Sequence, residues 1–201
     1  MKELVIATKN KGKIKEYEAL FNKFNISVKS LYDFKEPIDI DETGTTFHEN
    51  ALIKANTIKE RYNIPVLADD SGLAVDALNG APGIYSARYA GLEKDDQANN
   101  LKLLRELEGV PEAKRTAPFS VCALAFVIPN KNPIVVEGRL DGIISIEPKG
   151  TKGFGYDPLF YIPQLKKHAA ELSQEEKSAI SHRGNALREL KTHLEKMLDE
   201  K

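Results

Sequence analysis

Short apolar runs alternate with helical periodicity along most of the chain. Residues 4–7 form an apolar run between polar residues, and residues 66–68 form one between Ile64-Pro65 and Asp69; both are typical of buried strands. After the first run, Asn10 is a favourable N-cap, and apolar residues then recur every three or four positions, which predicts a helix. A partial alternation over residues 26–32 predicts a second strand, and residues 33–45 are acidic and irregular.

Further helices are predicted by capping signals and by apolar spacing. Thr46 and Glu49 have the spacing of a capping box and open a helix that carries Leu52, Ala55 and Ile58. A second helix is predicted over residues 95–108, with one apolar side formed by Leu101, Leu104 and Leu107.

The second half of the chain adds strands and a terminal helix. Residues 119–128 and 134–146 are typical of two long strands joined by a Pro- and Asn-containing loop, which predicts a hairpin. Ser173 and Glu176 form a second capping box before a terminal helix. This order predicts an α/β, or mixed α+β, fold, and two lobes around one extended sheet are compatible with it.

Composition and charge set limits on the class of protein. The 201 residues fit a single domain over residues 1–201, with 41% hydrophobic residues and a net charge of -1. This balance argues against non-specific nucleic-acid binding, which needs a basic face. Cys122 is the only cysteine, so no internal disulfide is possible, and no segment is apolar enough for a signal peptide or membrane span. We expect a soluble, cytoplasmic protein without a membrane partner.

The segment Asp69-Asp70-Ser71-Gly72 is the strongest candidate for chemistry. It follows a predicted strand, and the glycine predicts that the strand ends there in a turn. Adjacent strand residues point to opposite faces, so one carboxylate can face a site while the other anchors the turn. Carboxylates are preferred ligands of Mg²⁺, although aspartate and serine also form turns that have no further function.

The segment Thr8-Lys9-Asn10-Lys11-Gly12-Lys13 joins the first strand to the first helix. Backbone N–H groups at a helix start favour anions, and open α/β sheets often bind ligands after their strands. Lys13 lies where a cation opposes the helix dipole, so it is unfavourable there unless it meets an anion. The alternative is a solvated lysine in a lysine-rich segment.

Two further charged groups are candidates near this region. Asp39, Asp41 and Glu42 precede a glycine, and one of them, with Glu42 the best candidate, is expected to join Asp70 around a metal ion. A solvated acidic loop is the alternative. Lys54 lies two helical turns after Thr46 and can reach a phosphate or remain exposed.

A glycine-rich segment lies at residues 150–158. It matches neither the Walker A nor the Rossmann pattern, but its glycines permit close approach to a ligand. Phe154 and Tyr156 are candidates to stack on a base, and the alternative is a turn whose aromatics close the core.

The segment Ser181-His182-Arg183-Gly184 interrupts a helical pattern, one turn after Lys177. A glycine inside a helix costs about 1 kcal/mol relative to alanine, so something compensates for it. The polar donors beside it indicate a ligand, and a structural His–Arg pair is the alternative. The four histidines are too scattered for a zinc site, and nothing gives Ser71 an activating base.

Together these motifs resemble one family. Six ordered segments carry the resemblance: residues 7–16, 47–55, 69–73, 82–91, 153–158 and 175–184. The chain is similar to the inosine/xanthosine triphosphate pyrophosphatases, and the resemblance covers nearly its whole length. It implies a two-lobed fold around an extended mixed β-sheet, a homodimer, and Mg²⁺-dependent hydrolysis of ITP, dITP and XTP to the monophosphate and pyrophosphate, with Mn²⁺ as an alternative metal.

The resemblance also implies a role for each candidate residue. Asp70 would be catalytic, and Glu42 and Asp70 would hold the metal. The triphosphate would contact Lys54 and the segment Thr8, Lys9, Asn10, Lys11, Gly12 and Lys13, and Ser71 would touch the substrate. Phe154 would stack on the base, with the remaining substrate contacts from Gly155, Tyr156, Asp157, Lys177, Ser181, His182 and Arg183.

Two other functions remain open from the sequence. A related pyrophosphatase that acts on modified pyrimidine or other nucleotides would have a similar fold. A nucleotide sensor would bind a triphosphate without cleaving it. The presence of Asp70, Glu42 and Lys13 argues against a protein that has lost catalytic activity. A panel of substrates separates these possibilities.

Overall fold

The computed structural model describes residues 3–22, 25–36 and 38–199. The strands are β1 (Glu3–Ile6), β2 (Ser27–Ser30), β3 (Val66–Ala74), β4 (Thr116–Val127), β5 (Ile134–Ile144), β6 (Phe160–Ile162) and β7 (Lys167–His168). The α-helices are α1 (Lys11–Phe21), α2 (Phe47–Tyr62), α3 (Asp96–Glu106), α4 (Gln174–Ile180) and α5 (His182–Asp199). Short 3₁₀ helices are η2 (Leu31–Asp33), η3 (Asp76–Leu78), η4 (Gly83–Arg88), η5 (Glu112–Lys114) and η6 (Ala169–Glu171).

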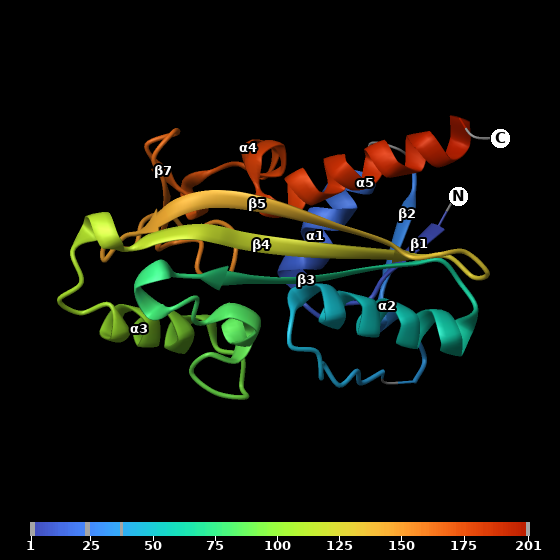
Figure 1. Cartoon of the computed structure of the whole chain (residues 1–201), viewed down its shortest axis with the longest axis horizontal. Helices are drawn as coiled ribbons and strands as arrows, with labels where there is room; N and C mark the ends of the chain where they lie inside the picture. The colour runs from blue at the N-terminus through green and yellow to red at the C-terminus, as the bar shows by residue number, and fades with distance from the viewer. Residues whose placement is uncertain (1–2, 23–24, 37, 200–201) are drawn as a thin grey trace. The chain divides into compact units, whose positions relative to one another are not determined.

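The described strands form one mixed sheet in the order β2-β1-β3-β4-β5-β6-β7. β1 is parallel to both β2 and β3, whereas β6 is antiparallel to both β5 and β7. The long strands β4 and β5 are neighbours joined by a short loop, which confirms the predicted hairpin (Figure 1). The mixed α/β class and the extended mixed sheet expected from the sequence are confirmed.

The chain divides into two compact units, each built from several separate segments. Unit 1 comprises residues 1–70, 122–138 and 185–201, and unit 2 comprises residues 71–121 and 139–184. The boundaries fall inside β3, β4, β5 and α5, so these four elements each contribute residues to both units.

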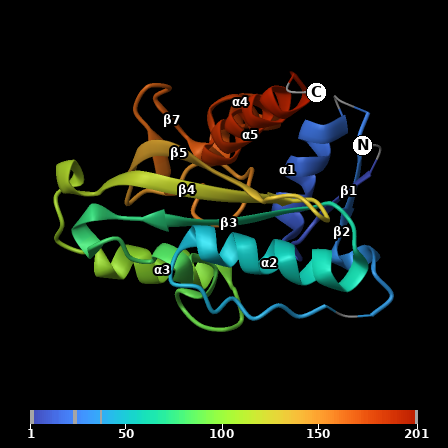
Figure 2. The same ribbon diagram turned by 45° about the vertical axis from the view of Figure 1, so that its right-hand side comes forward.

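Helices cover both faces of the sheet in unit 1. Alternate residues of β1 point to opposite sides: Val5 packs against α2 residues such as Ala55, and Leu4 packs with Tyr17 of α1. Figures 1 and 2 show α2 on one face of this part of the sheet, with α1 and α5 on the other. A sheet buried on both faces needs a continuous apolar run, which explains the composition of residues 4–7.

Unit 2 has its own hydrophobic core. Leu103 of α3 and Leu107, the C-cap of that helix, pack with Leu73 and Val75, and with residues of β5 and β6 such as Ile144 and Phe160. All six of these side chains are buried. Leu101, which was expected on the apolar side of α3, is exposed instead, because Leu103 and Leu107 define the face that meets the core.

Local signals in the sequence are mostly confirmed. The Asn10 side chain caps α1 by accepting from the Lys13 N–H, and Ser173 and Glu176 form the predicted capping box of α4. At α2 the box is only half formed: Thr46 accepts from the Glu49 N–H, but the Glu49 carboxylate accepts from Thr45.

The predicted end of the third strand at Gly72 is wrong. β3 continues to Ala74 because Leu73 and Val75 enter the core of unit 2, and their burial outweighs the local turn preference of the glycine. Among the residues described, no helix is both long and apolar enough to cross a membrane.

Candidate active site

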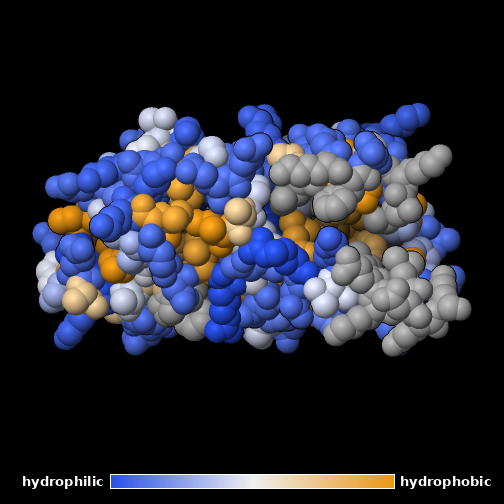
Figure 3. All heavy atoms as spheres, turned by 90° about the horizontal axis from the view of Figure 1, so that it is seen from above, coloured by the Kyte–Doolittle hydropathy of each residue, from blue (hydrophilic) through white to orange (hydrophobic). Residues whose placement is uncertain are grey.

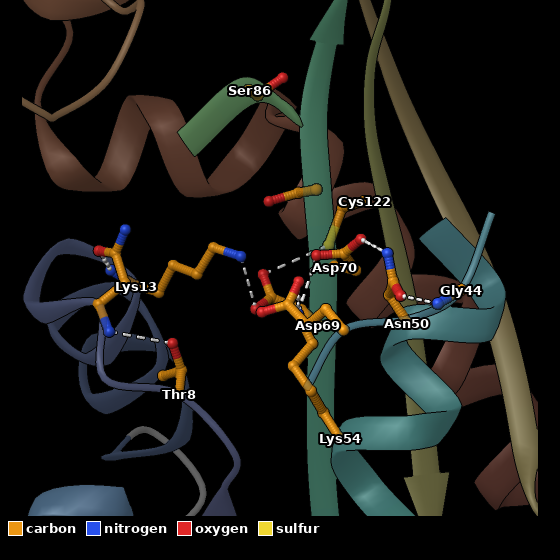
Figure 4. Close-up of polar contacts among 12 residues, drawn as sticks. Thr8, Lys13, Gly44, Asn50, Lys54, Asp69, Asp70, Ser86 and Cys122 are labelled. Atoms are coloured by element: carbon orange, nitrogen blue, oxygen red, sulfur yellow. Dashed lines mark hydrogen bonds and ion pairs between the residues drawn. The ribbon is translucent and has the colours of Figure 1, made fainter. Parts of the chain in front are cut away.

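Asp69 and Asp70 lie in the middle of β3 and point to opposite faces of the sheet. Leu67, two residues before Asp69, packs on the α1 side, and Ala68, two residues before Asp70, packs on the α2 side. Strand alternation therefore directs Asp69 toward α1 and Asp70 toward α2. Figure 4 shows the two carboxylates with different partners. The predicted opposite orientation is confirmed, and both side chains are buried.

Asp70 belongs to a cluster of charges on the α2 side. The Lys54 Nζ lies 2.8 Å from Asp70 Oδ1 and 3.5 Å from Glu42 Oε2. Lys54 and Asp70 are each about nine-tenths buried, whereas the Glu42 side chain is 29% exposed. The exposed alternative for Lys54 is therefore wrong. Glu42 of the acidic loop shares the Lys54 ammonium with Asp70, and their joint binding of a metal stays a prediction.

Asn50 connects this cluster to the acidic loop. Its Nδ2 donates to Asp70 Oδ2 at 3.3 Å, and its Oδ1 accepts from the Gly44 N–H at 2.8 Å (Figure 4). Asn50 and Lys54 are four residues apart, so they lie on the same face of α2. Sequence reasoning gave Asn50 no role, although its spacing from Lys54 was a usable signal.

Burial and opposite charge act against each other at this cluster. Burial raises the pKa of the Asp70 carboxyl above its ordinary value, even though Lys54 and Lys13 lower it. Burial lowers the pKa of Lys54, but the carboxylates of Asp70, Glu42 and Asp69 outweigh burial and raise it overall. Lys54 therefore stays charged at neutral pH and neutralises the carboxylates around it.

On the α1 side, Lys13 meets Asp69. Its Nζ lies 3.0 Å from Asp69 Oδ1, and the Lys13 side chain is only 12% exposed. The cation in the first turn of α1 thus has the anion that makes it favourable, and the solvated alternative for Lys13 is wrong. Cys122 Sγ lies 3.7 Å from Asp69 Oδ2 in the same buried region.

The other residues of the 8–13 segment are more exposed. Thr8 Oγ1 accepts from the Asn10 N–H at 3.1 Å, and Lys9 pairs with Asp39 at 2.8 Å on the surface. Lys11 is exposed, and Gly12 is partly buried. Thr8, Asn10 and Lys13 are linked by hydrogen bonds at the start of α1.

Glu42 and Asp70 offer the oxygen donors that Mg²⁺ prefers. Both carboxylates lie within ion-pair distance of one ammonium group, so they already converge on a position where a cation is favourable. Mg²⁺ is usually held by one or two carboxylates together with water and substrate phosphates. Among the described residues no group of three or more histidine, cysteine, aspartate or glutamate side chains could hold a metal. A pair of carboxylates is compatible with a magnesium ion that keeps water and substrate oxygens as its other ligands.

Unit 2 gathers a second group of predicted residues around Phe154. The Lys177 Nζ lies 4.8 Å from the centre of the Phe154 ring, and the Arg183 Cζ lies 5.9 Å from it. Asp157 Oδ2 accepts from the Phe154 N–H at 2.9 Å and pairs with the Lys177 Nζ at 2.6 Å. Cations over an aromatic face are attracted to it, so these contacts hold the half-buried ring in place.

The interruption at residues 181–184 is the junction between α4 and α5. Ser181 ends α4, and its Oγ accepts from the Gly184 N–H at 3.0 Å. A Cβ at Gly184 would lie 2.0 Å from the Ser178 carbonyl oxygen, so close packing of the two helices compensates for the glycine.

This junction places a buried guanidinium. Arg183 is 1% exposed, and its Nη2 donates to Ser71 Oγ at 3.3 Å. His182 is partly buried beside it. Ser71 and Arg183 are 112 residues apart in the sequence, and the fold brings them together. Their contacts with a substrate stay a prediction.

The backbone and hydroxyl groups of Gly155 and Tyr156 contact protein neighbours. The Gly155 N–H donates to Asp96 Oδ2 at 2.7 Å, and its carbonyl accepts from Asn100 Nδ2 at 2.9 Å. Burial raises the pKa of Tyr156, so its hydroxyl stays protonated and donates to the Ser86 carbonyl at 2.8 Å. Ligand contacts by these two residues stay a prediction.

Comparison with known proteins now places the chain in a family. The model of the Ham1 family matches residues 4–193. The chain belongs to the Ham1 family. This confirms the resemblance found in the sequence motifs.

Individual relatives of this Ham1 protein match along almost their whole length. A dITP/XTP pyrophosphatase of Halalkalibacterium halodurans is 58% identical over 94% of this chain and 97% of its own. One of Geobacillus kaustophilus is 55% identical over 98% of this chain and 97% of its own. The solved structure of the Staphylococcus aureus Ham1 protein is 45% identical with a TM-score of 0.85, covering 98% of this chain and 100% of that one.

Proposed function

We propose that this protein hydrolyses non-standard purine nucleoside triphosphates, namely ITP, dITP and XTP, to the monophosphate and pyrophosphate. The proposal is carried by one observation: each of the two buried aspartates of β3 pairs with a lysine, Asp69 with Lys13 of α1 and Asp70 with the buried Lys54 of α2. They lie in a chain 58% identical to a dITP/XTP pyrophosphatase.

The charges of unit 1 suit a triphosphate. Lys13 and Lys54 are each held by a buried carboxylate, so both ammonium groups are positioned before a phosphate arrives. Phosphoryl-type transfer depends mainly on positioning and charge neutralisation, which such fixed cations supply. We assign the phosphate groups to these lysines and to the start of α1.

Asp70 is the residue to which we assign the attacking water. Its carboxylate is fixed by Lys54 and Asn50, so it can orient a water toward the α-phosphorus and take its proton. Cleavage of the bond between the α-phosphorus and the bridging oxygen then releases pyrophosphate. A magnesium ion held by Glu42 and Asp70 would supply further neutralisation of phosphate charge.

We assign the purine base to the Phe154 group of unit 2. The ring can stack on a base, and Arg183, His182 and Lys177 carry hydrogen-bond donors. Hypoxanthine and xanthine present an acceptor at O6, whereas adenine presents an amino donor there. Donors left facing donors would disfavour ATP, because unpaired buried polar groups are costly.

The testing experiment measures binding of, and pyrophosphate release from, ITP, XTP, dITP, GTP, ATP and a modified pyrimidine triphosphate with Mg²⁺. The release assay is repeated with excess chelator. Release mainly from the first three, lost with the chelator and restored by Mg²⁺, would support the proposal. Equal release from ATP would contradict the donor-lined base site. Release from modified pyrimidine nucleotides alone would favour the related pyrophosphatase, and binding without release would favour the sensor.

The Asp70→Asn variant tests the catalytic assignment. We expect it to fold and to lose turnover by about 10²-fold or more, because the amide cannot take a proton from water. Asp41→Asn is the control, since Asp41 is an exposed carboxylate beside Glu42 and should keep wild-type rates. Near-normal turnover of Asp70→Asn would remove Asp70 from the mechanism.

We also propose a homodimer that acts in the cytoplasm. Hydrophobic patches interrupt the hydrophilic surface in Figure 3, and the exposed large side chains include Tyr85, Leu92 and Ile146. A second copy of the chain could cover such side chains. Light scattering over a range of protein concentrations gives the mass in solution. A monomer mass at every concentration would contradict the dimer.

A further inference from the structure

Two side chains of α3 hold the backbone N–H and the backbone carbonyl of one glycine, Gly155, in the loop that carries Phe154. Asp96 Oδ2 accepts from the Gly155 N–H at 2.7 Å, and Asn100 Nδ2 donates to the Gly155 carbonyl at 2.9 Å. Asp96 and Asn100 are four residues apart, so they lie one above the other on the same face of α3. We refer to Asp96, Asn100 and Gly155 as the Gly155 clamp.

The loop is held on either side of the clamp as well. The N–H of Phe154 donates to Asp157 Oδ2 at 2.9 Å, and the Tyr156 hydroxyl donates to the Ser86 carbonyl at 2.8 Å. Gly155 has a φ of 63°, which is in the left-handed region and is accessible to glycine at low cost. The backbone that follows Phe154 is therefore fixed by hydrogen bonds to α3, η4 and its own loop.

Asn100 is not explained by the needs of the helix. Asparagine is a poor helix former compared with alanine. In addition, its Oδ1 is buried and accepts no hydrogen bond within the part of the chain that the structure describes. What Asn100 contributes is its Nδ2 donor, and that donor goes to the Gly155 carbonyl.

We propose that Asp96 and Asn100 are positioning residues that fix the orientation of Phe154 for the purine base. This inference rests on the proposed function, in which Phe154 stacks on the base. The clamp holds the peptide next to Phe154, and Lys177 and Arg183 lie near its ring, so the ring is placed before the substrate binds. A preorganised ring loses less conformational freedom on binding, so the clamp acts on affinity rather than on the chemical step.

The test is a double-mutant cycle on KM and kcat for ITP with Asn100→Ala, Phe154→Ala and the double variant. We expect Asn100→Ala to raise KM about three- to tenfold with kcat nearly unchanged, which is the range for loss of one hydrogen bond. In the Phe154→Ala background the same substitution should change KM by less than about twofold, because the ring through which it acts is gone. Asp96→Ala removes the acceptor of the Gly155 N–H and should shift KM in the same direction.

Two comparisons separate this role from a merely structural one. Alanine is the better helix former, so we expect the melting temperature of Asn100→Ala to stay close to the wild-type value. Gln97→Ala changes an exposed side chain of the same helix and should leave KM unchanged.

The outcomes distinguish this inference from the proposed function. If wild type releases pyrophosphate and Asn100→Ala keeps the wild-type KM, the clamp has no positioning role. An equal KM effect with and without Phe154 would also overturn it. If wild type releases no pyrophosphate from any nucleotide, the proposed function fails, and this role fails with it.

Discussion

The aspartate pair of β3 shows how adjacent residues acquire different surroundings. Asp69 pairs with Lys13 of α1, and Asp70 pairs with Lys54 of α2, because strand side chains alternate between faces. Each buried carboxylate has a cation within 3.0 Å, as burial of a charge requires. One dipeptide thereby anchors the two lysines that we assign to the phosphates.

The Lys54→Met variant tests this balance of charge through pH. Burial already raises the pKa of Asp70, and Lys54 is the largest opposing influence, so its removal should raise that pKa further. Asp70 acts in its ionised form, so activity is lost as the pH falls through its pKa. We therefore expect the acid limb of the kcat/KM profile to move to higher pH.

The stability of the same variant gives an independent reading. The loss of Lys54 leaves Asp70 and Glu42 without their shared cation, which should lower the free energy of unfolding by about 3 kcal/mol at pH 7. Lys59→Met is the control, since Lys59 is one turn further along α2 and bonds Asn56 instead. An acid limb at the wild-type position would contradict the coupling between Lys54 and Asp70.

At the scale of elements, the junction of α4 and α5 is fixed by close backbone packing. Ser181 ends one helix and caps the turn, and Gly184 lets the next helix pass close to the Ser178 carbonyl. Only Ser181 separates α4 from α5, and the junction places Arg183 in a buried position near Ser71 and Phe154. The geometry of the junction, rather than its composition, determines where the guanidinium lies.

The Gly184→Ala variant tests this junction. The added Cβ would meet the Ser178 carbonyl oxygen at 2.0 Å, and a backbone atom cannot move away cheaply. We expect the free energy of unfolding to fall by about 1–3 kcal/mol in a chemical denaturation curve, and KM for ITP to rise because Arg183 is displaced. Arg188→Ala, an exposed change in the same helix, should stay within about 0.5 kcal/mol of wild type. Wild-type stability for Gly184→Ala would show that the helices can separate without cost.

For the whole molecule, the two units share elements rather than a linker. β3, β4, β5 and α5 each pass from one unit into the other, and neither unit is a single stretch of chain. The Asp70–Ser71 peptide bond is one of these crossings, and it joins a residue of the charge cluster to a partner of Arg183. Loss of either core would disturb strands that the other core also uses.

We therefore expect one cooperative unfolding transition. Leu67→Ala in the core of unit 1 and Leu159→Ala in the core of unit 2 each remove a fully buried side chain and should cost about 2–5 kcal/mol. Both should shift the same transition in calorimetry, with equal calorimetric and van't Hoff enthalpies. Two transitions, each moved by only one variant, would show that the units unfold independently.

Features that depend on a few neighbouring residues were readable from the chain alone. The Asn10 and Ser173 caps, the β4–β5 hairpin and the opposite orientation of Asp69 and Asp70 all follow from spacing over two to six residues. The family resemblance was also readable, because its motifs are ordered segments of sequence. By contrast, the continuation of β3 past Gly72 was missed, because it depends on where distant core residues lie.

The pairing of charges was decided only by the tertiary structure. Lys54 meets Asp70 across 16 residues, and Arg183 meets Ser71 across 112. No local pattern separates a solvated lysine from a buried one, because burial is a property of the packed elements around it. The same holds for Asp96 and Asn100, whose spacing is visible in the sequence. Their partner, the backbone of Gly155, lies more than fifty residues away in the chain. It meets them only when α3 packs in unit 2.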